Sequence, residues 1–84
     1  MNRLWKEGTI GIPLKDGGNK IAHFWAKVYD EGSEYGIDEG RISKLTVKID
    51  GVTVINYDRG WDVKPDEDDE VAQIALAILL NDYN

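Results

Sequence analysis

The chain has 84 residues, the size of one small domain, and it contains no cysteine, which excludes disulfide frameworks and thiolate metal sites. Its 42% hydrophobic residues are typical of a compact globular protein rather than of a disordered tail. The formal net charge of −6 disfavours a nucleic-acid ligand unless the basic side chains gather on one face.

The sequence carries no membrane signal. The segment Met1–Leu14 lacks the apolar run of a signal peptide. The strongly apolar run Val71–Leu80 is much shorter than the roughly 20 residues that a membrane-spanning helix needs. We therefore expect a cytoplasmic protein with no membrane partner.

The first strand-like segment is Arg3–Leu14. Gly8 and Gly11 interrupt it and Pro13 lies near its end, which predicts a bulged strand at the edge of a sheet. The following run, Lys15–Asn19, has the composition of a hairpin turn.

The segment Ile21–Tyr29 shows the clearest alternation of a strand. One side is uniformly apolar and is expected to face the core; it consists of Ala22, Phe24, Ala26 and Val28. The other side is mixed and is expected to face outward; it consists of Ile21, His23, Trp25, Lys27 and Tyr29.

A long acidic and glycine-containing loop, Asp30–Gly40, follows this strand. Loops of this length in a compact domain are often functional or mobile. The segment has a superficial likeness to a calcium-binding loop. Its sixth position is Tyr35 and its twelfth is Arg41, where an EF-hand needs glycine and glutamate, so a calcium site is excluded.

Two further strands, Arg41–Ile49 and Val52–Tyr57, flank Asp50-Gly51, which favours a two-residue type I′ hairpin. Such a turn predicts that Ile49 pairs with Val52, and the regular register continues along both strands. The further expected pairs are Val47 with Val54 and Leu45 with Asn56. The residues expected on the outer face are then Lys44, Thr46, Lys48, Thr53, Ile55 and Tyr57.

A helix is predicted after Pro65, with Asp66 as its N-cap and the acidic residues Glu67–Glu70 in its first turn. The helical run Val71–Leu80 is apolar on nearly all sides; its narrow polar stripe consists of Gln73, Ala77 and Asn81. Such a helix needs either a strongly curved sheet or a partner subunit to cover it, which makes a homodimer through this helix a hypothesis.

These elements predict a single α+β domain over residues 1–84. The expected architecture is a four-stranded, mostly antiparallel sheet with the order β-β-β-β-α, and one C-terminal helix packs on one of its faces.

Catalytic chemistry has little support in the residues. His23 lies within a strand, and Ser33 and Ser43 lie outside any Gly-x-Ser-x-Gly motif. Glycine-rich phosphate loops are absent from the sequence. Asp58 and Asp62 flank Arg59, which favours an ion-paired turn over a proton-donating pair of carboxyl groups. We expect no enzyme activity, no metal and no cofactor.

The outer sheet face is the main candidate for binding, because Trp25, Lys27, Lys44, Lys48 and Tyr57 are expected to share it. Aromatic and lysine side chains on an open sheet can stack bases and neutralise phosphates, or they can bind a protein partner. Alternatively, the lysines only cover the aromatic rings and protect the sheet from aggregation.

The acidic residues offer a second hypothesis. If they gather on one ridge, they would form a negative surface that occupies a basic nucleic-acid channel of another protein. These residues are Asp30, Glu31, Glu34, Asp38 and Glu39 of the long loop, Asp58, Asp62 and Asp66–Glu70. If they are spread evenly, they serve only solubility.

The motif NYDRGWD, Asn56–Asp62, allows a structural or a recognition role. In the structural interpretation Gly60 adopts a backbone conformation that its neighbours disfavour, and Trp61 covers the helix start. Arg59 then pairs with Asp58, Asp62 or the acidic loop. An outward Arg59 would indicate a binding site. The candidate binding residues are Trp25, Lys27, Glu34, Tyr35, Asp38, Lys44, Lys48, Tyr57, Arg59 and Trp61.

Three motifs resemble those of a family of small bacterial and phage-associated proteins classed as a domain of unknown function: WKEGTI, EYGIDEGRISKL and NYDRGWD. The likeness implies a gene carried by phages or mobile elements, a setting in which small acidic proteins often bind and inhibit host or defence proteins. We expect a non-catalytic protein-binding module that acts as an accessory or inhibitor protein. The alternative is nucleic-acid binding through the aromatic and lysine face.

Overall fold

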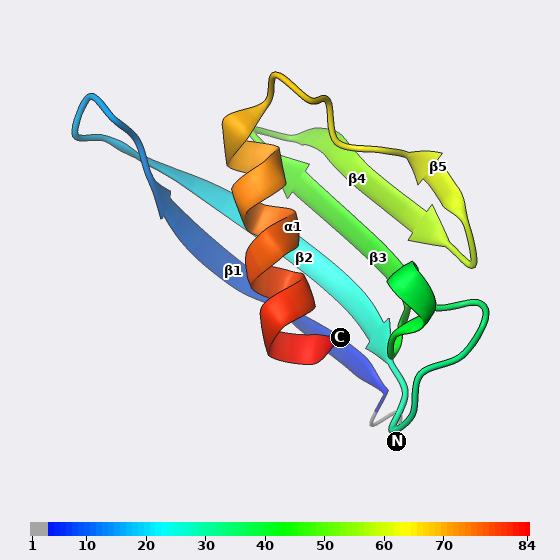
Figure 1. Ribbon diagram of the computed structural model, residues 1–84. Coiled ribbons are helices and arrows are strands. Elements are labelled where there is room, and N and C mark those ends of the chain that lie inside the picture. The colour runs from blue at the N-terminus through cyan, green and yellow to red at the C-terminus, as the bar shows by residue number, and fades with distance from the viewer. Residues whose placement is uncertain (1–3) are drawn as a thin grey trace.

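A computed structural model describes residues 4–84 (Figure 1). The elements in chain order are strand β1 (Trp5–Pro13), strand β2 (Asn19–Val28), 3₁₀ helix η1 (Ile37–Glu39), strand β3 (Ile42–Ile49), strand β4 (Val52–Asp58), strand β5 (Trp61–Val63) and helix α1 (Glu70–Tyr83). The strands form one sheet in the order β1-β2-β3-β4-β5, and every neighbouring pair is antiparallel. The α+β class and the C-terminal helix are confirmed. The expected number of strands is wrong, because Trp61–Val63 adds a fifth.

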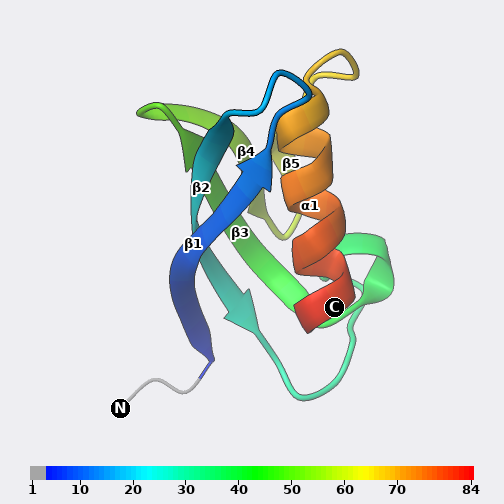
Figure 2. The same ribbon diagram turned by 90° about the vertical axis from the view of Figure 1, so that its left-hand side faces the viewer.

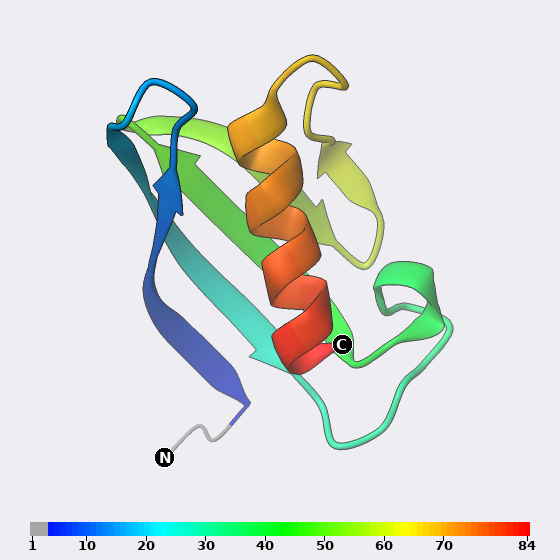
Figure 3. The ribbon, with the colours of Figure 1, turned by 60° about the vertical axis from the view of Figure 1, so that its left-hand side comes forward.

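The molecule has two layers, with α1 crossing one face of the sheet and contacting β1 to β4 (Figures 1 and 3). Figure 2 shows that no other element of residues 4–84 covers the opposite face of the sheet. We call this opposite face the open face. Because α1 has small buried side chains at Ala72 and Ala75, its backbone can approach the sheet closely.

The core follows the alternation of the strands. In β2, the apolar side with Ala22, Phe24, Ala26 and Val28 is buried as expected. Leu45 and Val47 of β3 and Leu79 of α1 complete the centre of the core. Further apolar side chains of α1, among them Leu76 and Leu80, pack against it, whereas Ile74 is 44% exposed.

The β1–β2 hairpin is regular. Its pairing runs without a shift from Trp5 opposite Lys27 to Pro13 opposite Asn19, so the expected bulge is wrong. Pro13 is the last residue of an edge strand, as predicted. The expected first residue of this strand, Arg3, lies outside the described residues.

The β3–β4 hairpin begins as predicted and then departs from the expected register. Asp50 and Gly51 have positive φ angles of 54° and 77°, as a type I′ turn requires, and Ile49 pairs with Val52. Between Lys48 and Val47 the register shifts, because Val54 is an extra residue in β4.

Because Val54 is an extra residue, the residues of β4 that follow it point to the opposite faces of the sheet from those expected. Val47 pairs with Ile55 and Leu45 with Tyr57, so the expected pairs of Val47 with Val54 and Leu45 with Asn56 are wrong. Ile55 and Tyr57 are therefore buried in the core rather than on the outer face. Asn56 takes an outward position, where it accepts a hydrogen bond from Thr46 at 3.3 Å.

The N-cap of the helix lies three residues later in the chain than expected. Asp69 is the N-cap, and its side chain accepts a hydrogen bond of 3.1 Å from the Ala72 amide. The Asp66 carboxylate instead accepts one of 2.9 Å from the Asp68 amide in the preceding turn. Asp66 therefore shapes the turn that leads into the helix rather than capping the helix itself.

The two ends of the antiparallel sheet differ in the turns and loops that they hold. The hairpin end holds the Leu14–Gly18 turn and the Asp50-Gly51 turn, and α1 starts there (Figure 1). The loop end holds the segment 29–41 and the Arg59-Gly60 turn, and α1 ends there (Figure 1). Over residues 4–84 we find no helix with the length and apolar character needed to cross a membrane.

Candidate functional site

The open face brings together four of the residues that were predicted for binding: Trp25, Lys27, Lys44 and Lys48. Trp25 lies opposite Thr46, and Lys27 lies opposite Lys44. The Trp25 ring stacks on the His23 ring with centroids 4.2 Å apart and planes inclined by 18°. The strand alternation of β2 and β3 therefore positions aromatic and cationic groups on one surface.

A shallow hollow of about 380 Å³ lies on this face between Trp5, Trp25, Thr46 and Lys48. Trp5 is 43% exposed and belongs to the edge strand β1. Sequence reasoning missed Trp5 as a candidate, although its place in the WKEGTI motif two residues before Glu7 puts it on the same side as the face. Two tryptophan side chains thus border the hollow.

The charges on the open face are partly balanced. Lys44 Nζ lies 3.7 Å from Asp58 Oδ1, and His23 Nε2 lies 3.2 Å from Glu7 Oε2. Both pairs are exposed, so each contributes little to stability and can be exchanged for a ligand contact. Lys27 lies over the Tyr29 ring, 5.4 Å from its centroid.

Tyr57 does not belong to this face, which corrects the sequence prediction. The bulge at Val54 turns Tyr57 into the core, where it is 6% exposed. Its hydroxyl group donates a hydrogen bond of 2.9 Å to the carbonyl oxygen of Tyr35. Tyr57 therefore holds the long loop in place rather than contacting a ligand.

The Arg59-Gly60 turn also differs from the expectation. Arg59, not Gly60, has the positive φ angle, at 59°. Asp58 pairs with Lys44, and none of the ion pairs within residues 4–84 includes Arg59. The exposed Arg59 guanidinium lies over the Tyr35 ring, 5.7 Å from its centroid. Arg59 is therefore presented outward rather than buried among acidic side chains.

Trp61 lies at the loop end, next to this turn, whereas α1 starts at the hairpin end (Figure 1). The expected position of Trp61 over the helix start is therefore wrong. Its ring meets the Tyr57 ring edge-on at a centroid distance of 5.1 Å, and Lys64 lies 5.9 Å from the Trp61 centroid. Trp61 extends the aromatic packing of Tyr57 toward the surface.

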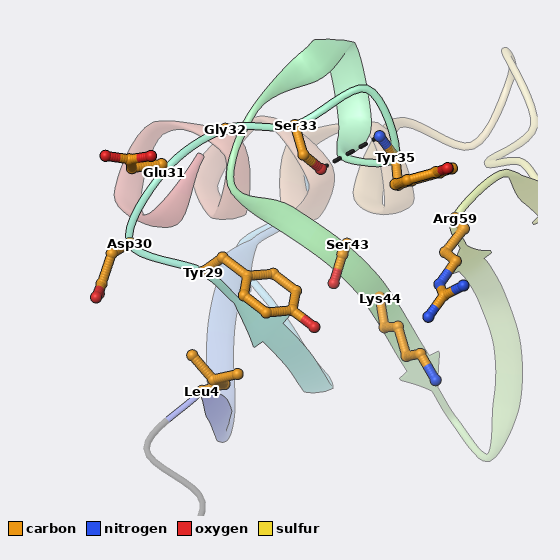
Figure 4. A pocket seen from close by; sticks show the side chains of 10 residues that line it. All are labelled: Leu4, Tyr29, Asp30, Glu31, Gly32, Ser33, Tyr35, Ser43, Lys44 and Arg59. Atoms are coloured by element: carbon orange, nitrogen blue, oxygen red, sulfur yellow. Dashed lines mark hydrogen bonds between the residues drawn. The ribbon is translucent and has the colours of Figure 1, made fainter.

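A larger cavity of about 660 Å³ lies at the loop end and includes three predicted residues: Tyr35, Lys44 and Arg59 (Figure 4). The side chain of Tyr29 also borders it. A hydrogen bond with Lys27 lowers the pKa of the Tyr29 hydroxyl below its usual range, and the positive charges of Lys27, Arg59 and Lys44 lower it further. The cavity therefore has a cationic side.

The acidic residues lie in two separate places rather than on one ridge. The cluster with Glu34 and Asp38 lies in the loop at the loop end, and Asp66–Glu70 lies at the hairpin end, where Glu70 pairs with Lys15 at 3.4 Å (Figure 1). This separation removes the support for a single acidic surface. In the part of the chain that the structure describes, no group of three or more His, Asp or Glu side chains is arranged to hold a metal ion.

The fold and these surfaces define a small two-layer α+β protein with an uncovered sheet face that carries aromatic and lysine side chains. Comparison with protein families gives a more specific assignment. The chain belongs to the family described as "Domain of unknown function (DUF7678)", whose family model matches residues 4–84. A search of curated proteins and a search of solved structures found no match.

Proposed function

We propose that this protein is a small, acidic, non-catalytic module that binds another protein through its open face. The hollow between the exposed Trp5 and the half-buried Trp25 carries this proposal, because tryptophans around a depression are typical anchors of protein interfaces. The exposed Ile21 adds apolar surface on the same side of β2. The partner is expected to insert an apolar side chain into the hollow.

The charge distribution favours a protein over a nucleic acid as the partner. The whole molecule carries a net charge of −6, and Asp58 neutralises Lys44 on the face itself. A polyanion would meet repulsion from the acidic loop at one end and from Asp66–Glu70 at the other. Lys27 and Lys48 suit individual carboxylate groups at the rim of a protein interface.

Nucleic-acid binding through the same face is the second candidate. The stacked pair of His23 and Trp25 supports it, because single-stranded nucleic acids bind proteins by stacking bases on aromatic rings beside lysines. Lys48 borders the hollow next to this pair and is placed to meet a phosphate. Binding of this kind would weaken steeply with salt.

The biological setting forms part of the proposal. The motif likeness to small bacterial and phage-associated proteins supports an accessory or inhibitory role in the cytoplasm of a host cell. A homodimer through α1 is a further part of it. Ile74 of α1, which is 44% exposed, is the side chain on which such a contact would centre.

Affinity capture from a bacterial lysate tests the main proposal when wild-type protein is compared with two variants. Trp25→Ala opens the wall of the hollow, and Lys48→Glu reverses a rim charge. Lys15→Glu at the hairpin end is the matched control, because it makes the same charge change far from the face. We expect the wild type and the control to retain the same specific protein, and the two face variants to lose it.

Retention of the same protein by both face variants would show that the open face is not the binding surface. Nuclease treatment of the lysate separates the two candidates. A capture that survives nuclease supports protein binding, and a capture that requires intact nucleic acid supports the second candidate.

A further inference from the structure

The cavity at the loop end has walls from three parts of the chain. The start of the long loop, with Asp30 and Glu31, forms one wall, and Tyr29 reaches across below it (Figure 4). Lys44 of β3 and Arg59 of the β4–β5 turn form the opposite side. A volume of about 660 Å³ is within the range of small-molecule sites.

Ser43 is the unusual group in this cavity. It is 5% exposed, and its Oγ atom has no hydrogen-bond partner among the described residues. Buried hydroxyl groups are nearly always paired, because an unpaired one loses its contacts with water without replacement. Figure 4 shows the Ser43 hydroxyl directed toward the Tyr29 ring. A donor is thus available to a ligand in the cavity.

A β-bulge places Ser43 there. Lys27 pairs with Lys44 and Val28 pairs with Ile42, so Ser43 is the extra residue between these two pairs. The bulge leaves Lys44 on the open side of the sheet while it turns Ser43 into the cavity. The irregularity therefore brings a hydroxyl and an ammonium group from neighbouring positions to the same site.

Hydrogen bonds anchor the backbone on the cationic side of the cavity. The Arg59 amide donates a hydrogen bond of 3.0 Å to the Ser43 carbonyl oxygen, which fixes the turn against β3. Tyr57 holds the Tyr35 carbonyl oxygen at 2.9 Å, and the Tyr35 ring supports the Arg59 guanidinium. A ligand would therefore meet donors that are already in position.

The donor set fits a phosphoryl group. Arg59 can bind two phosphoryl oxygens at once, Lys44 adds a second positive charge, and the Ser43 hydroxyl adds a neutral donor. These groups match the three terminal oxygens of a phosphate monoester better than the two oxygens of a carboxylate. Lys44 keeps its exposed contact with Asp58 at 3.7 Å in the free protein and can turn from it to the ligand.

The rest of the cavity sets the size of the ligand. The Tyr29 ring and Leu4 offer an aromatic and apolar surface for a ring-containing group. Asp30 and Glu31 also line the cavity, and their negative charges would repel a longer chain of phosphates. The surroundings therefore favour a compact ligand with one phosphate.

We propose that the loop-end cavity binds a small phosphate monoester with an aromatic ring, and that Ser43, Lys44 and Arg59 hold its phosphoryl group. This site goes beyond the proposed function, because it serves a small molecule; it shares Lys44 and Tyr29 with the open face but neither tryptophan of the hollow. Its failure leaves the protein-binding proposal unaffected, since Trp25 and Lys48 do not border this cavity.

Titration of the ¹⁵N-labelled protein with uridine 5′-monophosphate and with O-phospho-L-tyrosine tests the site, and uridine and tyrosine are the controls without phosphate. We expect the phosphate compounds to shift the amide signals of Ser43, Lys44 and Arg59, and the controls to leave them unchanged. A preference for one of the two phosphate compounds identifies which kind of ring the Tyr29 side accepts.

Two variants and one control sharpen this titration. Arg59→Gln removes the guanidinium charge, and we expect it to weaken binding about tenfold or more. Ser43→Ala is expected to weaken binding several-fold while its melting temperature stays at or above that of the wild type. Lys15→Gln removes an equal charge at the hairpin end, outside the cavity and the open face, and is expected to bind as the wild type does.

Three results would overturn the site. Binding of uridine as tight as that of its monophosphate would exclude phosphoryl recognition. Unchanged affinity of Arg59→Gln would exclude the cavity as the location. Equal weakening by Lys15→Gln would show that only the overall charge matters.

Discussion

The chain reverses direction at both ends of the sheet, but different kinds of residue adopt the positive φ angles at the two ends. At the hairpin end the positive φ angles fall on residues that adopt them readily: Gly17 at 96°, Gly51 at 77° and Asp50 at 54°. At the loop end they fall on Asp38 at 51°, Glu39 at 58° and Arg59 at 59°. Within residues 4–84, no glycine at the loop end has a positive φ angle.

The glycines at the loop end serve close approach instead. A Cβ atom at Gly36 would overlap the carbonyl oxygen of Gly40, and one at Gly40 would overlap the side chain of Asn84. The backbone conformation at the hairpin end therefore follows from local turn chemistry. At the loop end it follows from tertiary contacts and from the outward placement of Arg59. Local strain that no turn rule requires is a common mark of a functional site.

The largest expected effect tests the hairpin end. Gly51→Val places a β-branched residue at a φ angle of 77°, and we expect it to lower the free energy of unfolding by about 2–3 kcal/mol. Urea denaturation measures this loss. Gly51→Asn is the control and is expected to cost less than about 1 kcal/mol, because asparagine tolerates this conformation. Equal losses in the two variants would show that the turn conformation is not the cause.

The next effect tests the tertiary contacts of the loop end. Asn84 accepts a hydrogen bond of 3.0 Å from the Ile42 amide and donates one of 2.9 Å to the Ile37 carbonyl oxygen. Asn84→Ala leaves both backbone groups without these partners, and we expect a loss of about 1–3 kcal/mol in the free energy of unfolding. The exposed Asn81→Ala is the control. Hydrogen exchange that is unchanged at Ile42 in Asn84→Ala would contradict the role of this side chain.

A gain in stability is expected from Ser43→Ala. The variant removes a buried hydroxyl group that has no partner in the free protein, so the free energy of unfolding should rise by about 1 kcal/mol. Ser33→Ala is the comparison, because Ser33 Oγ accepts a hydrogen bond of 3.2 Å from the Tyr35 amide. Chemical denaturation is expected to show opposite signs for the two variants. A loss in Ser43→Ala would mean that its hydroxyl group stabilises the free protein.

The smallest effect on stability is expected for Arg59→Gly. Glycine relieves the positive φ angle of 59°, while the unfolded chain gains conformational freedom, and the two effects offset each other. We expect a change of less than about 0.5 kcal/mol in denaturation experiments, together with the loss of phosphate-monoester binding. A loss above about 1 kcal/mol would identify Arg59 as a structural residue and would remove the distinction between the two ends.

The sequence predicts the elements whose signals are local. The alternation of Ile21–Tyr29 identifies the buried and the open side of β2, and Asp50-Gly51 identifies the turn geometry. Both depend on residues within one element, so packing elsewhere does not change them. The part of the open face formed by Trp25, Lys27, Lys44 and Lys48 is predictable for the same reason.

The features that sequence reasoning missed depend on non-local contacts. The two adjacent apolar residues Val54 and Ile55 are the local signal of the bulge, but the core alone decides which of them is the extra residue. The fifth strand is too short to show an alternating pattern. The loop-end cavity needs Ser43 to lie beside Arg59, whereas the predicted register places Ser43 opposite Asp58, so this contact depends on the bulge at Val54.

The contacts of Asn84 also have a consequence for the order of folding. They join residues that are 42 and 47 positions apart in the chain, whereas each hairpin joins neighbouring segments. Because closing a long loop costs more chain entropy than closing a hairpin, we expect the meander to form first and the loop end to become ordered last. In refolding experiments, the Tyr35 and Ile37 signals of the long loop are then expected to reach their native state after those of the hairpin turns.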